Sequence, residues 1–420
     1  MSETIIQQHL AEAARAARAG LDDAARVQFE AVLTIDQGEP NARNWLGADA
    51  LARGNAAAAA GHFDVACGRE PKERSHWMNL AAAHRLLEDR GGERHALEAA
   101  LAIDQTDLLA LVRIAELHER LGEDRPATER WSAVLVLSAS ITNPSPEFAA
   151  ILSHARAYVG AQQRKLDGAV EAALADPLAG ASVRDRRRMQ TAADAWLGKR
   201  PIYANQCEGL HYPFLPADEF FDREHFAWLG ELEAATAVIA GEMAAILADR
   251  DAGLTPYIDL PAGVAANKWS GLDKSLDWGA FHLWKEGVRF DDACARAPRT
   301  AALVEALPIC HIVGRAPNVF FSILKAGKHI PAHCGVTNVR SVVHLPLIVP
   351  AGCAFRVGGE SRNWVKGQAF VFDDTIEHEA WNRSKHDRAI LIIDAWNPHL
   401  SDDERAMICS LYGAADGRHG

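Results

Sequence analysis

Two stretches decide how the C-terminal half of this 420-residue chain is interpreted: PAHCGVTNVR (residues 331–340) and FDDTIEHEAWNRSKHDR (residues 372–388). They place His333 and His378 45 residues apart, with Arg388 ten residues after the second histidine, among short strand-like runs. Neutral imidazoles from two strands can ligate iron, and an arginine deeper in a barrel can hold an anionic cosubstrate. The pattern therefore predicts a small barrel around one metal ion.

The surrounding sequence has the pattern of short strands separated by turns. The apolar runs are VFFSILKAG, RSVVHLPLIVP, CAFRV, NWVKGQAFVFDD and RAILIIDAW, all between residues 319 and 396. Runs of this length and spacing are typical of a β-sandwich or barrel. We expect a jelly roll with one open end, where polar residues at the strand ends converge.

The first 140 residues repeat with a period of 34. Four copies begin near Ile6, Pro40, Arg74 and Leu108. Within each copy a small residue and a bulky apolar residue recur, at Ala13, Gly47, Ala81 and Ala115 and at Phe29, Phe63, Leu97 and Trp131. This period and these positions resemble the tetratricopeptide repeat over about residues 6–141.

The repeats predict an all-α domain over residues 1–141, in which helical hairpins stack into a superhelix with a concave groove. We expect that groove to recruit a peptide or protein substrate, and the alternative is an array that only packs on the next domain or forms a dimer. Residues 142–200 are predicted as a helical linker, with a solvated basic run RDRRR (residues 184–188). Residues 201–420 then form the second domain.

Bulk composition excludes several classes of function. The formal net charge is -12 and the pI about 5.8, so nucleic acid and anionic membranes are not expected partners. The sequence begins without a signal-peptide core and contains no apolar run of about 18 residues, which predicts a cytoplasmic protein. Seven cysteines without C-x-x-C spacing predict reduced thiols rather than disulfides or a zinc site.

The third protein ligand of a usual iron site is missing. Jelly-roll iron oxygenases usually carry a carboxylate two residues after the first histidine, and that position is Gly335. Asp373 or Asp374 could supply a carboxylate instead, since Asp374 is four residues before His378. A turn carboxylate more often caps backbone N–H groups or orients a ligand histidine, so we favour a site without a third protein ligand. Trp364, Trp381 and Trp396 are predicted barrel core.

Several blocks resemble the aspartyl/asparaginyl β-hydroxylase family of Fe(II)- and 2-oxoglutarate-dependent oxygenases. They are DWGAFHLWKEG, CARAPRTAALVEALP, GKHIPAHCGVTNVRSVVHLPLIVP and GESRNWVKGQAFVFDDTIEHEAWNRSKHDRAILIIDAWNP, in the order of the family, over about residues 201–400. The resemblance implies an α+β multidomain protein in which the repeats precede a C-terminal double-stranded β-helix, a cupin-like jelly roll with flanking helices. Tetratricopeptide repeats ahead of such a domain also fit the architectures of this family.

The resemblance also implies roles for individual residues. His333 and His378 would be the iron ligands, and glycine at the Gly335 position is the family's own pattern. Arg388 would pair with the distal carboxylate of 2-oxoglutarate. Ser322, Trp278 and His344 would also contact the cosubstrate. Arg340 would be a catalytic-site residue near the substrate.

Two departures concern the substrate. Mammalian members carry a second arginine two residues beyond the Arg340 position, where this chain has Val342, and another shortly before the Trp278 position, where this chain has Ser-Leu-Asp preceded by Lys274. Fewer cations weaken the grip on an acidic side chain, so acceptance of aspartate is an open question.

The predicted function is that of an enzyme that uses Fe(II), 2-oxoglutarate and O2. It would hydroxylate an unactivated C–H bond, on the β-carbon of an Asp/Asn-type residue in a peptide or protein recruited by the repeats. Two alternatives stay open, a repeat-based binding scaffold with a degenerate oxygenase domain and a hydroxylase of lipid acyl chains. The sequence leaves the oligomeric state open.

Overall fold

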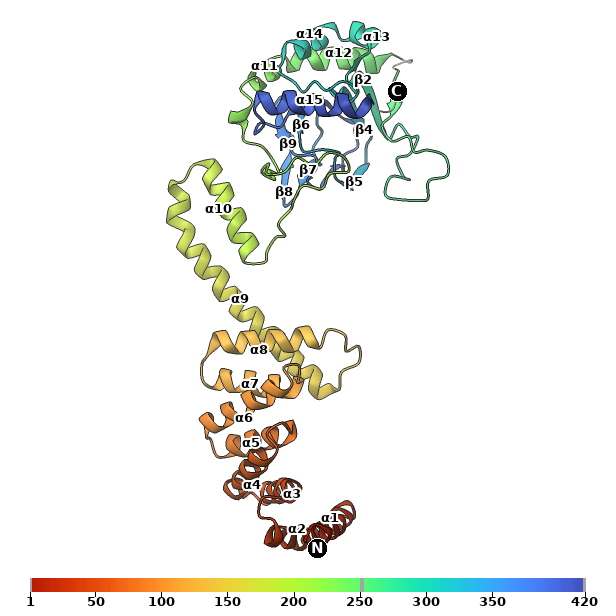
Figure 1. Ribbon diagram of the computed structural model, residues 1–420. Coiled ribbons are helices and arrows are strands. Elements are labelled where there is room, and N and C mark those ends of the chain that lie inside the picture. The colour runs from red at the N-terminus through yellow and green to blue at the C-terminus, as the bar shows by residue number, and fades with distance from the viewer. Residues whose placement is uncertain (1, 250–252, 418–420) are drawn as a thin grey trace. The chain divides into compact units, whose positions relative to one another are not determined.

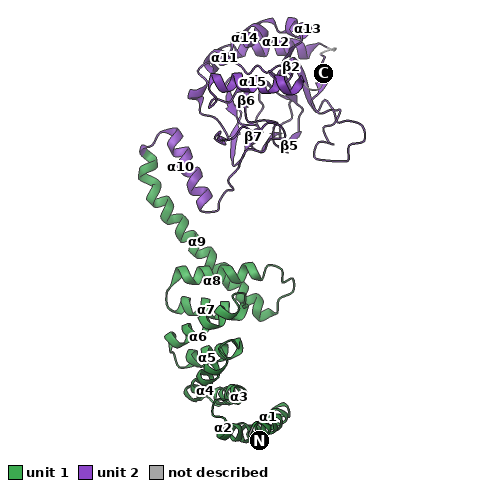
Figure 2. Ribbon diagram, viewed as in Figure 1, with its two compact units in different colours: residues 1–179 green, residues 180–420 purple. Residues whose placement is uncertain are grey.

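A computed structural model describes residues 2–249 and 253–417, which fall into two compact units, Met1–Ala179 and Gly180–Gly420 (Figure 2). The first unit is helical, and the second combines antiparallel sheets with helices. The division lies about 20 residues before the predicted start of the second domain at residue 201. Each unit is described by itself below.

The first unit is a series of helical pairs (Figure 1). The pairs are α1 (Ser2–Arg18) with α2 (Asp22–Ile35), α3 (Pro40–Ala52) with α4 (Ala56–Arg69), α5 (Arg74–Leu86) with α6 (Arg90–Ile103), and α7 (Leu108–Arg120) with α8 (Asp124–Leu137). The helices α3, α5 and α7 begin 34 residues apart, and so do α4, α6 and α8. The predicted repeat is confirmed by this spacing.

The recurring small and bulky residues are where the two helices of each pair meet. Ala13, Ala81 and Ala115 are at most 2% exposed, and Phe63, Leu97 and Trp131 at most 1%. The contact in the second pair is close, because a Cβ atom on Gly47 of α3 would lie 2.5 Å from Cε1 of Phe63 on α4. A small residue at this position is therefore required by the closeness of the two helices.

The predicted linker forms two helices, α9 (Pro146–Gly180) and α10 (Val183–Trp196). The basic run lies on α10, and it is not simply solvated as predicted. Arg184 forms an ion pair with Asp222 at 2.9 Å, and Arg187 forms one with Glu360 at 2.7 Å. These contacts place α10 with the C-terminal unit, which explains why the division lies before this helix.

Two antiparallel sheets make up the second unit. The larger has the order β1-β2-β4-β11-β6-β9, with β3 beside β2; its strands are β1 (Thr255–Pro256), β2 (Trp278–Lys285), β3 (Val288–Arg289), β4 (Val319–Leu324), β6 (Arg340–Ile348), β9 (Phe370–Phe372) and β11 (Arg388–Trp396). The smaller has the order β5-β10-β7-β8; its strands are β5 (His329–His333), β7 (Cys353–Val357), β8 (Glu360–Asn363) and β10 (His378–Asn382).

Helices accompany the sheets of this unit. They are η1 (Arg223–His225), α11 (Leu229–Ala234), α12 (Thr236–Ala248), α13 (Asp291–Arg296), α14 (Pro298–Ala306) and α15 (Asp402–Asp416). Figure 1 shows α12 and α14 over one side of the larger sheet, and α12 contacts both α14 and β6. Nowhere in residues 2–249 and 253–417 does a helix combine the length and the apolarity needed to cross a membrane.

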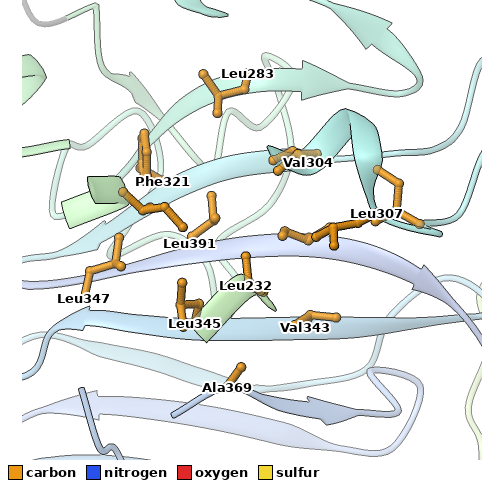
Figure 3. Packing of buried hydrophobic residues seen from close by; sticks show 14 of the residues in the cluster. Leu232, Leu283, Val304, Leu307, Phe321, Val343, Leu345, Leu347, Ala369 and Leu391 are labelled. Carbon is orange, nitrogen blue, oxygen red and sulfur yellow. The ribbon is translucent and has the colours of Figure 1, made fainter. Parts of the chain in front are cut away.

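Alternation along the central strands separates two cores. Leu391 and Ile393 of β11 belong to the cluster that includes Leu232 and Val304 of the covering helices (Figure 3). Their neighbour Ile390 belongs to a second cluster, which also contains residues of the smaller sheet. Because successive strand side chains point to opposite faces, the larger sheet has one face under the helices and the other toward the smaller sheet.

We predict that Gly47→Val lowers the free energy of unfolding by about 1–3 kcal/mol, because the new methyl groups overlap the buried Phe63 ring. The matched control is Gly61→Val, since a side chain at Gly61 of α4 meets nothing within 4 Å; it should change stability by no more than about 0.5 kcal/mol. Urea unfolding of the full chain measures both. Equal effects of the two changes would contradict the close packing of α3 and α4.

Candidate active site

His333 and His378 lie opposite each other on neighbouring strands. His333 ends β5, His378 begins β10, and the antiparallel register pairs the two residues directly. Their ring centroids are 4.0 Å apart and the ring planes are inclined by 53°. The two histidine side chains, 45 residues apart in the sequence, are thus in contact, as predicted from the sequence.

The same ring nitrogen is occupied in both histidines. Nδ1 of His333 lies 2.8 Å from the carbonyl oxygen of Pro331, and Nδ1 of His378 lies 3.0 Å from that of Ile376. A carbonyl oxygen only accepts, so each Nδ1 carries the hydrogen and each Nε2 keeps a free lone pair. Burial lowers the pKa of His333 to about 4 and that of His378 to about 3, so both rings are neutral near pH 7.

The two histidines line a cavity of about 250 Å³ between the sheets, here called the histidine cavity. Every site residue predicted from the sequence lines it: Trp278, Ser322, His333, Arg340, His344, His378 and Arg388. They come from six strands, because β2, β4, β6 and β11 of the larger sheet face β5 and β10 of the smaller one. The structure therefore brings the whole predicted set together.

Arg388 is a buried cation without a carboxylate partner in the described part of the chain. The residue is 1% exposed, its Nε has no hydrogen bond within residues 2–249 and 253–417, and its guanidinium lies 5.3 Å from the centre of the Trp364 ring. Burial lowers its pKa to about 10. A buried charge is costly without a counter-charge, so this end of the histidine cavity is suited to an anion.

The neighbours of Arg388 are neutral hydrogen-bonding groups. Trp278 Nε1 donates to Ser322 Oγ at 3.0 Å, which leaves the hydroxyl hydrogen of Ser322 available as a donor. Burial and the charge of Arg388 lower the pKa of His344 well below its usual value. His344 stacks on Trp364 at 5.4 Å, so Trp364, predicted as core, is both buried and part of the cavity wall.

Gly335 and Asp374 occupy one space. A side chain on Gly335 would overlap the Asp374 carboxylate, so the residue that lacks a side chain makes room for a carboxyl group from the turn before β10. Burial raises the pKa of Asp374 to about 7, against the opposing effect of Arg340. No group of three or more His, Cys, Asp or Glu side chains in the described ranges has metal-binding geometry, so Asp374 does not complete a triad with the histidines.

Some cavity residues were not singled out from the sequence. Tyr257 stacks on Trp278 with ring centroids 4.0 Å apart, and Trp269 packs edge-on against His333 at 4.9 Å. Asp394 forms an ion pair with Arg340 at 2.9 Å. The carboxylate of Asp394 interrupts the apolar run RAILIIDAW, which is a signal that sequence reasoning could have used, whereas Tyr257 and Trp269 lie outside any regular pattern.

The paired imidazoles and the buried arginine thus lie between two facing antiparallel sheets of one β domain. Residues 233–398 match the model of the family described as Aspartyl/Asparaginyl beta-hydroxylase. This part of the chain is similar to that family, which confirms the resemblance seen in the sequence.

The relatives match mainly this second unit. The human Aspartyl/asparaginyl beta-hydroxylase is 37% identical over 164 residues, 39% of this chain and 21% of that protein, so the chain spans about a fifth of this relative. The Ornithine lipid ester-linked acyl 2-hydroxylase of Rhizobium tropici is 32% identical over 192 residues, 45% of this chain and 64% of that protein. A solved tetratricopeptide-repeat protein of Thermus thermophilus is 22% identical with a TM-score of 0.29, covering 45% of this chain and 98% of that one.

We predict that Gly335→Ala destabilises the chain by about 1–3 kcal/mol, because the added methyl group displaces the Asp374 carboxylate from a packed site. Gly271→Ala is the control, since a side chain there meets nothing within 4 Å, and its effect should stay within about 0.5 kcal/mol. Thermal unfolding of both variants measures the difference. Wild-type stability of Gly335→Ala would show that the two residues do not share one space.

We predict that the free energy of unfolding of the metal-free chain falls between about pH 6.5 and pH 4. Imidazoles in the unfolded chain titrate near pH 6.5, whereas folded His333 and His378 have pKa values of about 4 and about 3, so the unfolded state binds protons first. Asp373 and Asp374, with pKa values raised to about 6 and about 7, act in the opposite direction and offset most of this effect. The net fall comes from two more buried histidines, because burial lowers the pKa of His282 to about 4 and that of His344 well below its usual value. Urea titrations across this range measure the slope, and stability that rises on acidification would refute it.

Proposed function

We propose that this chain is an Fe(II)- and 2-oxoglutarate-dependent hydroxylase. One observation carries the proposal: two neutral imidazoles with free Nε2 atoms share the histidine cavity with a buried arginine that lacks a counter-charge among the described residues. The similarity of residues 233–398 to the aspartyl/asparaginyl β-hydroxylase family supports the same reaction class. The two facing antiparallel sheets are inferred to be the double-stranded β-helix expected from the sequence.

The donor set fits a ferrous ion. His333 and His378 would hold it through Nε2, because the carbonyl oxygens of Pro331 and Ile376 fix the Nδ1–H form of both rings. Imidazole ligands suit Fe(II), and two protein ligands leave positions for other molecules. Asp374 lies beside Gly335, where a third ligand usually stands; it would orient groups near the metal and would not join the histidines as a ligand.

The residues at the other end fit a dicarboxylate cosubstrate. The planar guanidinium of Arg388 would bind the distal carboxylate of 2-oxoglutarate through two N–H groups. Ser322 would donate its hydroxyl hydrogen to the same anion, since its oxygen already accepts from Trp278. Neutral His344 would add a hydrogen bond without competing charge, because burial keeps its pKa low.

When bound, iron together with 2-oxoglutarate and O2 would convert a C–H bond of the substrate to C–OH, and succinate and CO2 would be the other products. The chain supplies position and exclusion of water. Trp278, Phe320, Phe355 and Ile390 close the walls between the two polar ends of the cavity. Arg340 and Asp394 would lie on the substrate side of the cavity, and their ion pair would set the charge at that end.

Two substrates are supported by different observations. The four helical pairs of the first unit favour a peptide or protein, recruited by the repeats and hydroxylated on the β-carbon of an Asp/Asn-type residue. The Rhizobium tropici relative, named as an acyl 2-hydroxylase, favours a lipid acyl chain instead. The third possibility, a binding scaffold with a degenerate second domain, is opposed by the complete set of cavity residues.

We predict that His378→Ala abolishes succinate formation from 2-oxoglutarate by the anaerobically reconstituted full chain after exposure to O2. Loss of residues that merely orient ligands costs about 10–100-fold in metal affinity, so loss of a ligand should cost more than about 100-fold. Arg388→Lys should retain iron but raise the KM for 2-oxoglutarate by about 10-fold or more, since a lysine cannot form the paired hydrogen bonds. Iron content and succinate yield measure the two effects.

The control is His386→Ala, an exposed histidine on the turn before β11, which should keep wild-type iron content and turnover. Stoichiometric iron in His378→Ala would remove the proposed ligand role. Absence of succinate from the wild-type chain, with peptide or lipid candidates present or absent, would favour the scaffold.

A further inference from the structure

The two arginines of the histidine cavity come from different strands and lie near opposite ends of β11. Arg388 is the first residue of β11, and Arg340 is held by Asp394, six residues further along the same strand. With a rise of about 3.3 Å per residue, the backbones of residues 388 and 394 are about 20 Å apart. A five-carbon cosubstrate bound at Arg388 does not extend over that distance, so Arg340 belongs to the part of the cavity left for the substrate.

The positive charge of Arg340 is already compensated. Its Nη1 lies 2.9 Å from Asp394 Oδ2, and the side chains of the pair are 15% and 5% exposed. The same carboxylate oxygen accepts from the backbone N–H and the side-chain Nδ2 of Asn318, at 2.8 and 2.7 Å. Asp394 is therefore held by three donors and stays beside Arg340 when a substrate enters.

No other cation among the described residues is placed to compensate a carboxylate there. Of the cavity-lining residues that the structure describes, the cations are Arg340 and Arg388, while Asp374, Glu379 and Asp394 are acidic. Val342, next to this pair, is opposite Asp394 on β6 and is apolar. Lys268 is not among the residues that line the histidine cavity; it lines an adjoining pocket, which shares His333 with that cavity and also contains Glu208 and Glu377. An anionic group would lose its hydration at the Arg340 end without gaining a free counter-charge.

The unsatisfied atoms at this end are one donor and one acceptor. Arg340 Nε and Asp374 Oδ1 are both buried, and neither has a hydrogen-bond partner within the described ranges. The two side chains interact electrostatically. A primary carboxamide carries one acceptor oxygen and an NH2 donor, so it complements an N–H and a carboxyl oxygen at the same time, whereas a carboxylate offers acceptors only.

We propose that the substrate end of the histidine cavity takes a carboxamide group and discriminates against a carboxylate, with Asp394 as the specificity-determining residue that cancels Arg340. This inference rests on the proposed hydroxylase function. It narrows the Asp/Asn-type substrate class to the uncharged member, and it assigns the preference to an ion pair within the chain.

The test compares two probes of the same shape, Nα-acetyl-asparagine methylamide and Nα-acetyl-aspartate methylamide. The full chain is loaded with Mn(II) and 2-oxoglutarate, and binding is followed by paramagnetic broadening of the probe's proton signals. The asparagine probe should bind about 10-fold more tightly or better, since one uncompensated buried charge is at stake. Equal binding, tighter binding of the aspartate probe, or no binding of either would overturn the inference.

Variants separate charge from shape. Val342→Arg adds a cation without a partner and should shift the ratio of the two affinities at least about 10-fold toward the aspartate probe, while Val342→Leu, which adds bulk alone, should leave the ratio unchanged. Asp394→Asn should act like Val342→Arg, provided the variant melts as the wild-type chain does. An unchanged ratio in Val342→Arg would sink the assignment even if Asp394→Asn does not fold.

Succinate formation without any probe distinguishes this failure from failure of the proposed function. A chain that turns over 2-oxoglutarate yet shows no preference between the probes keeps its proposed function and loses the inference. A chain that retains no Mn(II) and forms no succinate loses both.

Discussion

The register between β5 and β10 is the constraint on which the site depends. Because His333 and His378 are direct antiparallel partners, both rings project from the same face of the smaller sheet at the same height. A slip of one residue would turn one imidazole to the opposite face. The carbonyl oxygens of Pro331 and Ile376, each two residues before its histidine, then fix the ring nitrogen that stays free. Strand pairing and local backbone geometry therefore set position and tautomer together.

In the larger sheet, the alternation of side chains gives the two faces different roles. The odd-numbered residues of β11 anchor the helices through Leu391 and Ile393, and the even-numbered residues run from Arg388 through Ile390 to Asp394 along the histidine cavity. Apolar burial on one face stabilises the position of every polar group on the other. Two arginines at opposite ends can thus differ in charge compensation: Arg388 is buried without a carboxylate partner among the described residues, and Arg340 lies beside Asp394.

Much of the fold and the predicted site could be read from the chain because their signals are local. The 34-residue period predicted the helical pairs, since each hairpin repeats the same contact between a small and a bulky residue, such as Gly47 with Phe63. Ordered motifs carried the resemblance to the family and with it the seven predicted site residues, all of which line the histidine cavity. The basic run of α10 was misjudged, because its partners Asp222 and Glu360 are distant in sequence and no local pattern indicates them.

The sequence by itself determined which residue types carry the chemistry: two histidines, an arginine and a glycine where a carboxylate usually stands. Only the tertiary structure decided their electrostatic state. Arg340 and Asp394 are 54 residues apart in the chain and 2.9 Å apart in space, and Asp374 fills the volume beside Gly335 from a different strand end. Charge compensation falls steeply with distance and depends on burial, so it is fixed by which strands meet and not by the order of residues along the chain.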